Sequence, residues 1–231
     1  MKQTIWIARH GNREDFIDPS WIEMASQPFN PALSPDGVEQ AKALGQRLVG
    51  KDIRHIFASP FLRTVQTANY VAEAIALPIK IEAGLSEFLS FSLISLTPEI
   101  LSLPALKQRF PRIDLEYTSR VTVRYPESEG VMLARSRQTI RQFTREFPEN
   151  FLIVTHSSPI ACMSRELLQQ KIKIRRPLCG LVKLVKEGDR WTMECNGDIS
   201  HLANLPDNCR GLDKFSDLRR KIILAQRVLL Q

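Results

Sequence analysis

The feature that most constrains the fold of this chain is a set of short apolar runs that alternate with longer segments of helical periodicity. The two clearest runs are residues 4–8 (Thr-Ile-Trp-Ile-Ala) and 151–155 (Phe-Leu-Ile-Val-Thr), a shorter one occupies 55–58, and residues 79–82 (Ile-Lys-Ile-Glu) alternate between apolar and charged as in a strand. Continuous apolar runs of this length are typical of strands that are buried on both faces. The pattern therefore predicts a largely parallel sheet with helices on both sides.

Helix starts follow from a repeated Ser-Pro pattern, in which a capping serine precedes proline at the first helical position. The pairs are Ser34-Pro35, Ser59-Pro60 and Ser158-Pro159. We expect the first helix to end near Gly50 and the second before Pro78, and a further long helix to cover about 129–147. Two β-like segments, about 179–186 and 190–196, flank a turn at 187–189, which indicates an antiparallel hairpin at one sheet edge.

The length of 231 residues fits a single domain. Within it, residues 88–128 lose periodicity and contain four prolines, which favours an inserted, cap-like subdomain. Residues 214–230 form an amphipathic tail that we expect to be helical. The predicted fold is therefore α/β, a three-layer αβα arrangement with a mostly parallel sheet, an antiparallel edge hairpin and an inserted subdomain.

Composition removes several function classes. The net charge is +7, but the basic residues are scattered and no aromatic-interleaved basic stripe accompanies them, so we expect no nucleic-acid partner. No run reaches the ~18 apolar residues of a membrane span, so we expect no membrane partner. The four cysteines lack CxxC spacing, which favours reduced thiols, no zinc site and a cytoplasmic location.

The polar residues that follow the predicted strands are of one chemical kind. Arg9-His10 follows the first strand, Arg63 lies just past the second, Glu87 follows the third and His156 follows the fourth. Because ligands bind outside the carboxyl ends of parallel strands, we expect these five side chains to share one edge of the sheet.

Such a set suits phosphoryl transfer. Guanidinium forks match phosphate oxygens, and Arg63 also falls in the first turn of a helix, whose free N–H groups favour an anion. A neutral imidazole can attack phosphorus, and His156 could act as a charged hydrogen-bond donor to phosphate. Glu87 is then left as the group that protonates the leaving oxygen.

Four motifs, in order, resemble those of the histidine phosphatase superfamily, also called the phosphoglycerate-mutase-like family. They are Arg9-His10-Gly11, Leu33-Ser34-Pro35-Asp36-Gly37, the segment 59–68 (Ser-Pro-Phe-Leu-Arg-Thr-Val-Gln-Thr-Ala) and Val154-Thr155-His156-Ser157. The resemblance covers about residues 4–170 and implies hydrolysis of phosphate monoesters without metal or other cofactor. The implied substrate is a small-molecule or phosphoprotein phosphomonoester.

The resemblance also implies a role for each site residue. His10 is the expected phosphorylated nucleophile and Glu87 the expected proton donor, while Arg9, Arg63 and His156 form the phosphate pocket. Arg13 is expected to add a further cation, and Asn12 and Ser157 are counted among the phosphate-binding residues. Five other carboxylates stay open as proton donors: Glu82, which we expect within the third strand, and Glu14, Asp15, Glu127 and Glu129.

Asn12-Arg13 is similar to one branch of the superfamily, which includes the phosphatase domains of UBA- and SH3-containing signalling regulators and the ecdysteroid-phosphate phosphatases. Because neither module is recognisable, we expect a free-standing catalytic domain. The family resemblance alone allows a homodimer.

Two other functions stay open, a cofactor-dependent phosphoglycerate mutase and a catalytically silent phosphate-binding regulatory protein. Residues assigned either to a substrate mouth or to packing are Trp21, Phe29, Phe88 and Phe91, and His55 and His201 are assigned to the surface or to packing.

Overall fold

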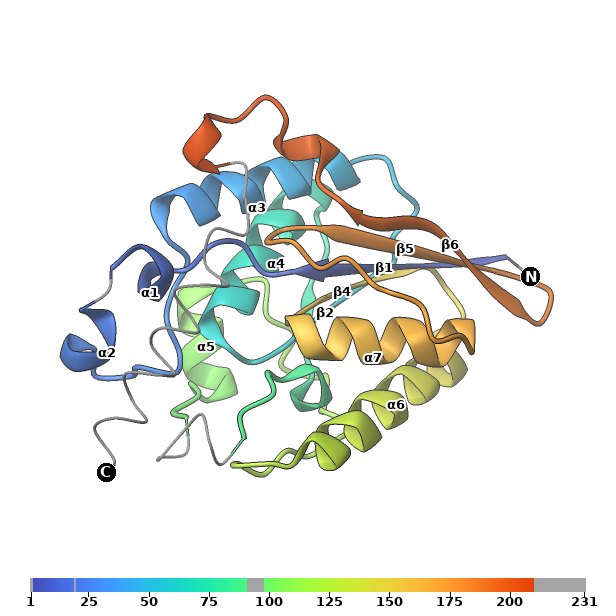
Figure 1. Cartoon of the computed structure of the whole chain (residues 1–231), viewed down its shortest axis with the longest axis horizontal. Coiled ribbons are helices and arrows are strands. Elements are labelled where there is room, and N and C mark those ends of the chain that lie inside the picture. The colour runs from blue at the N-terminus through green and yellow to red at the C-terminus, as the bar shows by residue number, and fades with distance from the viewer. Residues whose placement is uncertain (1, 19, 91–97, 210–231) are drawn as a thin grey trace.

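A single mixed sheet forms the centre of the molecule. The computed structural model describes residues 2–18, 20–90 and 98–209. The strands are β1 (Gln3–Arg9), β2 (His55–Ala58), β3 (Ile79–Ile81), β4 (Phe151–Thr155), β5 (Leu181–Glu187) and β6 (Arg190–Asp198). Their order is β3-β2-β4-β1-β5-β6 (Figure 1). The first four strands of this order are parallel, and β5 and β6 add an antiparallel hairpin, which confirms the predicted α/β fold.

Helices cover both faces of the sheet (Figure 1). They are α1 (Glu14–Ile17), α2 (Trp21–Met24), α3 (Pro35–Leu48), α4 (Leu62–Ile75), α5 (Leu103–Arg109), α6 (Glu129–Glu146) and α7 (Ser157–Leu168), with short 3-10 helices η1 (Ala83–Leu85), η2 (Ser200–Leu202) and η3 (Asp207–Cys209). Since side chains alternate along a strand, Trp6 and Ala8 of β1 pack toward α3 and α4, whereas Ile5 and Ile7 pack toward α6 and α7.

An aromatic cluster holds α6 against the sheet. The Phe57 ring of β2 lies 4.1 Å from the Phe143 ring of α6, centroid to centroid, and the Phe151 ring of β4 meets both rings edge-on. Buried aromatic pairs of this kind contribute about 0.5–1.5 kcal/mol each beyond their burial. This face of the fold therefore gives α6 a fixed position relative to the strand ends.

Two of the three predicted helix starts are wrong by a few residues. Ser34 caps α3 as expected, because its hydroxyl accepts a hydrogen bond from the Gly37 amide. Helix α4 instead begins at Leu62, after Phe61, with no side-chain cap, and α7 begins at Ser157, directly after His156. The Ser59 hydroxyl lies 2.8 Å from Nε2 of His156, and it accepts a longer hydrogen bond of 3.5 Å from the backbone amide of Phe61, the residue directly before α4.

The described part of the 88–128 segment packs at the β3 edge of the sheet. Ile113 forms a parallel bridge with Ile79, and α5 contributes Leu106 to the core. Its separate role as a cap stays a prediction. The predicted helical tail at 214–230 lies outside the described residues. Among the described residues, no helix has the length and apolar character needed to cross a membrane.

Candidate active site

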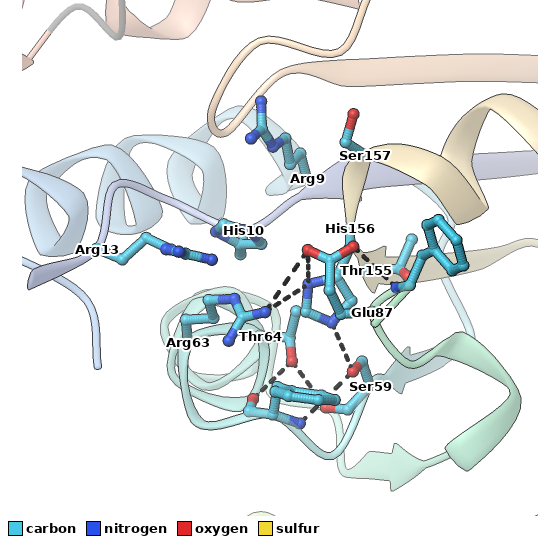
Figure 2. A network of polar contacts seen from close by, with 12 residues as sticks. Arg9, His10, Arg13, Ser59, Arg63, Thr64, Glu87, Thr155, His156 and Ser157 are labelled. Atoms are coloured by element: carbon cyan, nitrogen blue, oxygen red, sulfur yellow. Dashed lines mark hydrogen bonds and ion pairs between the residues drawn. The ribbon is translucent and has the colours of Figure 1, made fainter. Parts of the chain in front are cut away.

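The two histidines of interest lie side by side because their strands are neighbours. Arg9 of β1 pairs with Thr155 of β4, so His10 and His156 leave the sheet together, and their ring centroids lie 5.3 Å apart. The His10 amide donates a hydrogen bond to the Thr155 carbonyl. Figure 2 shows both rings at the centre of a group of charged side chains. The predicted convergence of the two strand ends is present in the structure.

His10 has the form of a neutral imidazole with one nitrogen free to react. Its Nδ1 lies 2.8 Å from the Gly11 carbonyl oxygen, and because a carbonyl can only accept, Nδ1 carries the proton. The lone pair of Nε2 is therefore available. Burial, followed by the positive charges of Arg63, Arg9 and Arg13, holds the pKa of His10 well below its usual value of 6.5. The ring thus stays neutral at physiological pH.

His156 is buried and oriented from both sides. Its Nε2 lies 2.8 Å from the Ser59 hydroxyl, and its Nδ1 lies 3.3 Å from a guanidinium nitrogen of Arg63. Since a guanidinium only donates, Nδ1 acts as the acceptor and Nε2–H donates to Ser59. Burial, then Arg63 and His10, hold the pKa of His156 well below 6.5. Burial and the neighbouring cations therefore favour the neutral ring, and the expected role of a charged His156 as a hydrogen-bond donor to phosphate stays a prediction.

Three arginines surround the two rings. Arg63, in the first turn of α4, is 1% exposed and stacks over the Phe61 ring at 4.7 Å. Arg9 lies on the other side of the rings, near Ser157 (Figure 2), and donates a hydrogen bond to the Arg176 carbonyl. This arrangement concentrates positive charge around the His10 ring.

Arg13 approaches His10 from the loop before α1 (Figure 2). Its guanidinium pairs with Asp15 and lies 4.2 Å from the centre of the Phe16 ring, so α1 itself orients the side chain. Arg13 is therefore a held cation at the edge of the site, and its role in binding phosphate stays a prediction.

Glu87 is the carboxylate that the structure brings to the two histidines. One carboxylate oxygen lies 3.5 Å from Nδ1 of His156 and 3.6 Å from the Arg63 guanidinium, and the other accepts a hydrogen bond from the Phe88 amide. The side chain is 6% exposed. Glu87 therefore stands beside the rings, within the charged group.

Three of the competing carboxylates are engaged elsewhere. Glu82 lies just past β3 and not within it, and it accepts five hydrogen bonds from η1 and the 117–121 segment. Asp15 pairs with Arg13, and Glu127 pairs with the buried Arg135. Of the other two, Glu14 begins α1 and is half-buried, and Glu129 is exposed at the start of α6.

The loop after His10 is packed tightly against the start of α3. A Cβ on Gly11 would lie 2.6 Å from the Gly37 carbonyl oxygen, so a side chain has no room there. The side-chain nitrogen Nδ2 of Asn12 donates a hydrogen bond to the Asp36 carboxylate. This contact orders the loop and uses one of the two N–H groups of the Asn12 side chain. Ser157 is the first residue of α7, and its carbonyl accepts a hydrogen bond from Arg176, whose own carbonyl accepts one from Arg9.

Sequence reasoning missed two residues that order the site. Ser59 was assigned to helix capping but contacts His156, and the Thr67 hydroxyl of α4 accepts a hydrogen bond from the Gly11 amide. The Ser-Pro pattern is shared with a true cap at Ser34, so it carries no signal that separates these roles. Thr67 lies on the buried face of a helix and has no local signal.

The outlying aromatic and histidine side chains have contacts of their own. The Trp21 indole donates to the Pro28 carbonyl, and Phe29 packs on the small cluster around Phe61. Phe88 is half-buried, and Phe91 lies outside the described residues. His55 meets Glu149 at the opposite end of the sheet, and His201 lies 3.1 Å from the Cys179 carbonyl.

The site favours an anion over a cation. Within the described parts of the chain, His10, Glu87 and His156 form the one group of ligand atoms spaced for a metal ion, within 4.8 Å of one another. Arg63 already lies within 3.6 Å of both Glu87 and His156. A metal cation there would be repelled by the guanidinium groups, whereas a phosphate dianion would be attracted to them.

Comparison with known proteins agrees with this chemistry. The family model described as histidine phosphatase superfamily (branch 1) matches residues 5–199. The ecdysteroid-phosphate phosphatase of Drosophila melanogaster is 28% identical over 87% of this chain and 33% of its own length. The ubiquitin-associated and SH3 domain-containing protein A of Mus musculus is 32% identical over 72% of this chain and 33% of its own length. The chain thus spans about a third of the length of these two relatives.

A solved structure shares the fold. The crystal structure of the ecdysone phosphate phosphatase from Bombix mori, in complex with tungstate, superposes with a TM-score of 0.69 at 20% sequence identity, covering 84% of this chain and 92% of the other. The predicted resemblance to this branch is confirmed by these matches.

Proposed function

The chain belongs to the histidine phosphatase superfamily (branch 1), and from this premise we propose that it hydrolyses phosphate monoesters through a covalent phosphohistidine on His10. One observation carries the proposal most directly. The Nδ1 proton of His10 is held by the Gly11 carbonyl, and the pKa of the buried ring is lowered by burial and by Arg63, Arg9 and Arg13. A neutral ring with a free Nε2 is the form that attacks phosphorus.

In the first step, the phosphate dianion binds among Arg9, Arg13 and Arg63. The Nε2 lone pair of His10 forms a bond to phosphorus while the bond between phosphorus and the leaving oxygen breaks. Glu87, in its acid form, gives its proton to that oxygen, so the alcohol or phenol leaves neutral. Charge on the transferred oxygens is met by the guanidinium groups.

In the second step, water attacks the phosphohistidine. The Glu87 carboxylate accepts a proton from the water, a bond from water oxygen to phosphorus forms, and the bond from phosphorus to Nε2 breaks. Inorganic phosphate leaves, and both His10 and Glu87 return to their starting forms. His156 donates Nε2–H to Ser59, which fixes its ring next to His10 and Glu87.

Asn12 and Ser157 are the outer members of the proposed phosphate set. Ser157 opens α7, a helix of 12 residues whose first N–H groups and dipole favour an anion. The Asn12 side-chain amide gives one of its two N–H groups to Asp36, so only the second can be offered to phosphate. We therefore place Asn12 last in order of expected effect on phosphate affinity.

The test is the turnover of 4-nitrophenyl phosphate by the wild type, His10→Ala and a matched control, His55→Ala. His55 is the first residue of β2, at the end of the sheet opposite to His10, where it meets Glu149. We expect His10→Ala to lose turnover and His55→Ala to retain it. Activity that persists in His10→Ala would contradict the nucleophile assignment.

The same preparation separates the two other functions. Faster phosphoryl transfer between 3- and 2-phosphoglycerate than hydrolysis of either would favour a mutase. Binding of inorganic phosphate without turnover of any monoester in a broad panel would favour a silent phosphate-binding protein. The panel should include a phosphotyrosine, a sugar phosphate, a nucleotide and a steroid phosphate, because the common pocket contacts only the phosphate.

A further inference from the structure

The loop that carries Glu87 is tied down through its backbone carbonyl groups. The Gly84 carbonyl accepts from Arg135, the Leu85 carbonyl from the Thr155 hydroxyl, and the Leu89 carbonyl from the Glu127 amide. The carbonyl of Glu87 itself accepts two hydrogen bonds, from Arg135 at 3.1 Å and from the Tyr125 hydroxyl at 3.0 Å. The residues that donate these bonds come from α6, β4 and the 125–127 segment.

Arg135 of α6 is the centre of this arrangement. It is 5% exposed, and its guanidinium contacts both carboxylate oxygens of Glu127, the Gly84 carbonyl and the Glu87 carbonyl at once. Glu127 is 3% exposed. A guanidinium presents five donors in a rigid plane, so one side chain can hold three partners in fixed relative positions, which an ammonium group cannot do.

The loop also touches α6 directly. A Cβ on Gly84 would lie 2.1 Å from the Thr139 hydroxyl, which is one helical turn beyond Arg135. The absence of a side chain at Gly84 therefore allows the loop backbone to reach the guanidinium. Phe143 packs α6 against the sheet that carries His10, and Arg135 of the same helix binds the Glu87 loop. The position of Glu87 relative to His10 is therefore fixed through α6.

We propose that Arg135, held and neutralised by Glu127, is the positioning residue that aims Glu87 at the leaving-group oxygen. This inference rests on the proposed function, because it assigns a partner to the proton donor. Arg135 contacts the Glu87 backbone and acts on the chemistry only through it. Glu127 supplies the counter-charge that lets a guanidinium be buried beside the acid.

Displacing Glu87 should slow only those substrates whose leaving group needs a proton. 4-Nitrophenolate is a weak base that departs without a proton, whereas phenol, with a pKa near the value of about 10 for tyrosine, needs one. A displaced Glu87 should therefore slow phenyl phosphate and spare 4-nitrophenyl phosphate. A general loss of folded protein, or a damaged phosphate pocket, would lower kcat/KM for both substrates by the same factor.

The variant of choice is the double substitution Arg135→Met with Glu127→Gln. Removing Arg135 alone would leave a buried carboxylate without its partner, which destabilises folds strongly. Removing both charges together avoids that penalty. The matched control is Arg120→Met with Glu146→Gln, because this exposed ion pair also joins α6 to the 117–121 segment but does not touch the Glu87 loop.

We expect kcat/KM of the double variant to fall about tenfold or more for phenyl phosphate and to change less than about threefold for 4-nitrophenyl phosphate. The control pair should leave the ratio of the two substrates unchanged. Arg135→Lys, which keeps the charge but not the fork, should give an intermediate ratio. An equal loss on both substrates, or an unchanged ratio in a folded double variant, would overturn the proposal.

Glu87→Gln, measured beside these variants, separates the two levels of inference. We expect its kcat/KM to fall about a hundredfold for phenyl phosphate and much less for 4-nitrophenyl phosphate, because kcat/KM reports the first chemical step. Its kcat should fall for both substrates, since Glu87 also accepts the proton of water in the second step. If Glu87→Gln shows no leaving-group selectivity, the assignment of the proton donor fails and the proposed mechanism with it. If Glu87→Gln is selective and the Arg135/Glu127 variant is not, only the positioning role is refuted.

Discussion

The substitution Glu82→Gln tests whether the two buried glutamates after β3 have different roles, a structural one for Glu82 and proton donation for Glu87. Glu82 is fully buried, and its carboxylate accepts hydrogen bonds from the donors Gly84 N, Tyr117 OH, Ser119 OH, Arg120 N and Val121 N, at 2.8 to 3.1 Å. Burial and the adjacent carboxylate raise the pKa of Tyr117, so its phenol stays a donor. Glu82 therefore joins η1 to the 117–121 segment.

The expected cost follows from this contact set. In glutamine, one oxygen becomes an amide nitrogen that cannot accept; the less costly orientation places it opposite Tyr117 and Arg120, where two bonds are lost. Hydrogen bonds to a charged group contribute about 1.5–3 kcal/mol each. Since the Tyr117 hydroxyl can rotate and accept from the new amide, we expect a loss near the lower end, about 3–4 kcal/mol.

The assays are urea unfolding for the free energy of unfolding, thermal unfolding for Tm, and turnover of the folded protein. The expected loss corresponds to a fall in Tm of about 6–16 °C for a domain of this size. Leaving-group selectivity should match the wild type, since Glu87 is untouched. The matched control is Glu146→Gln, a partly exposed carboxylate that contacts Arg120, for which about 1 kcal/mol or less is expected.

The opposite result would refute the reasoning. If Glu82→Gln keeps its stability but its kcat/KM falls for phenyl phosphate and not for 4-nitrophenyl phosphate, Glu82 is the proton donor and Glu87 is not. Glu82, which the sequence left open as an alternative to Glu87, would then be the proton donor.

Three further outcomes follow from the site. The folded state holds the pKa of His10 and His156 below 6.5, so below pH 6.5 the unfolded chain binds more protons than the folded chain. The free energy of unfolding should therefore decrease as the pH falls below 6.5, by up to about 1.4 kcal/mol per pH unit for each group. His156→Gln should reduce that slope, as measured by urea unfolding at several pH values. A slope unchanged by His156→Gln would contradict this. Inorganic phosphate at 100 times its Kd should stabilise the wild type by about 2.7 kcal/mol and stabilise Arg63→Met much less, as measured by thermal unfolding; equal stabilisation of both would place the anion elsewhere. Chelation by EDTA should leave 4-nitrophenyl phosphate turnover unchanged, and a loss restored by added metal would assign a cation to His10, Glu87 and His156.

The parts of the site that sequence could predict are those set by strand ends. His10 and His156 each follow a continuous apolar run, and parallel strands bring such positions to one edge. Arg63 was predictable for the same reason, since it lies in the first turn after β2. The mostly parallel character of the sheet and its edge hairpin also follow from patterns of apolar residues and turns, whereas the order of the strands was not predicted.

What sequence could not predict depends on contacts between distant segments. Arg135 and Glu127 lie in and just before a helix where charged residues are ordinarily solvated, and nothing local shows that they are buried beside the Glu87 loop. Ser59 is part of the same Ser-Pro pattern as the true cap Ser34, although its hydroxyl contacts His156. The charge state of His156 depends on burial and on Arg63, neither of which the sequence shows.

The most direct test of the central claim is to trap the phosphorylated enzyme. Wild type mixed with excess 4-nitrophenyl phosphate should be quenched during turnover and digested at alkaline pH, and its peptides examined by mass spectrometry. The account predicts one phosphoryl group on the His10 ring, stable in alkali, lost in acid and absent from His10→Ala. A phosphoryl group on another residue, or full turnover by His10→Ala without any phosphoenzyme, would contradict it.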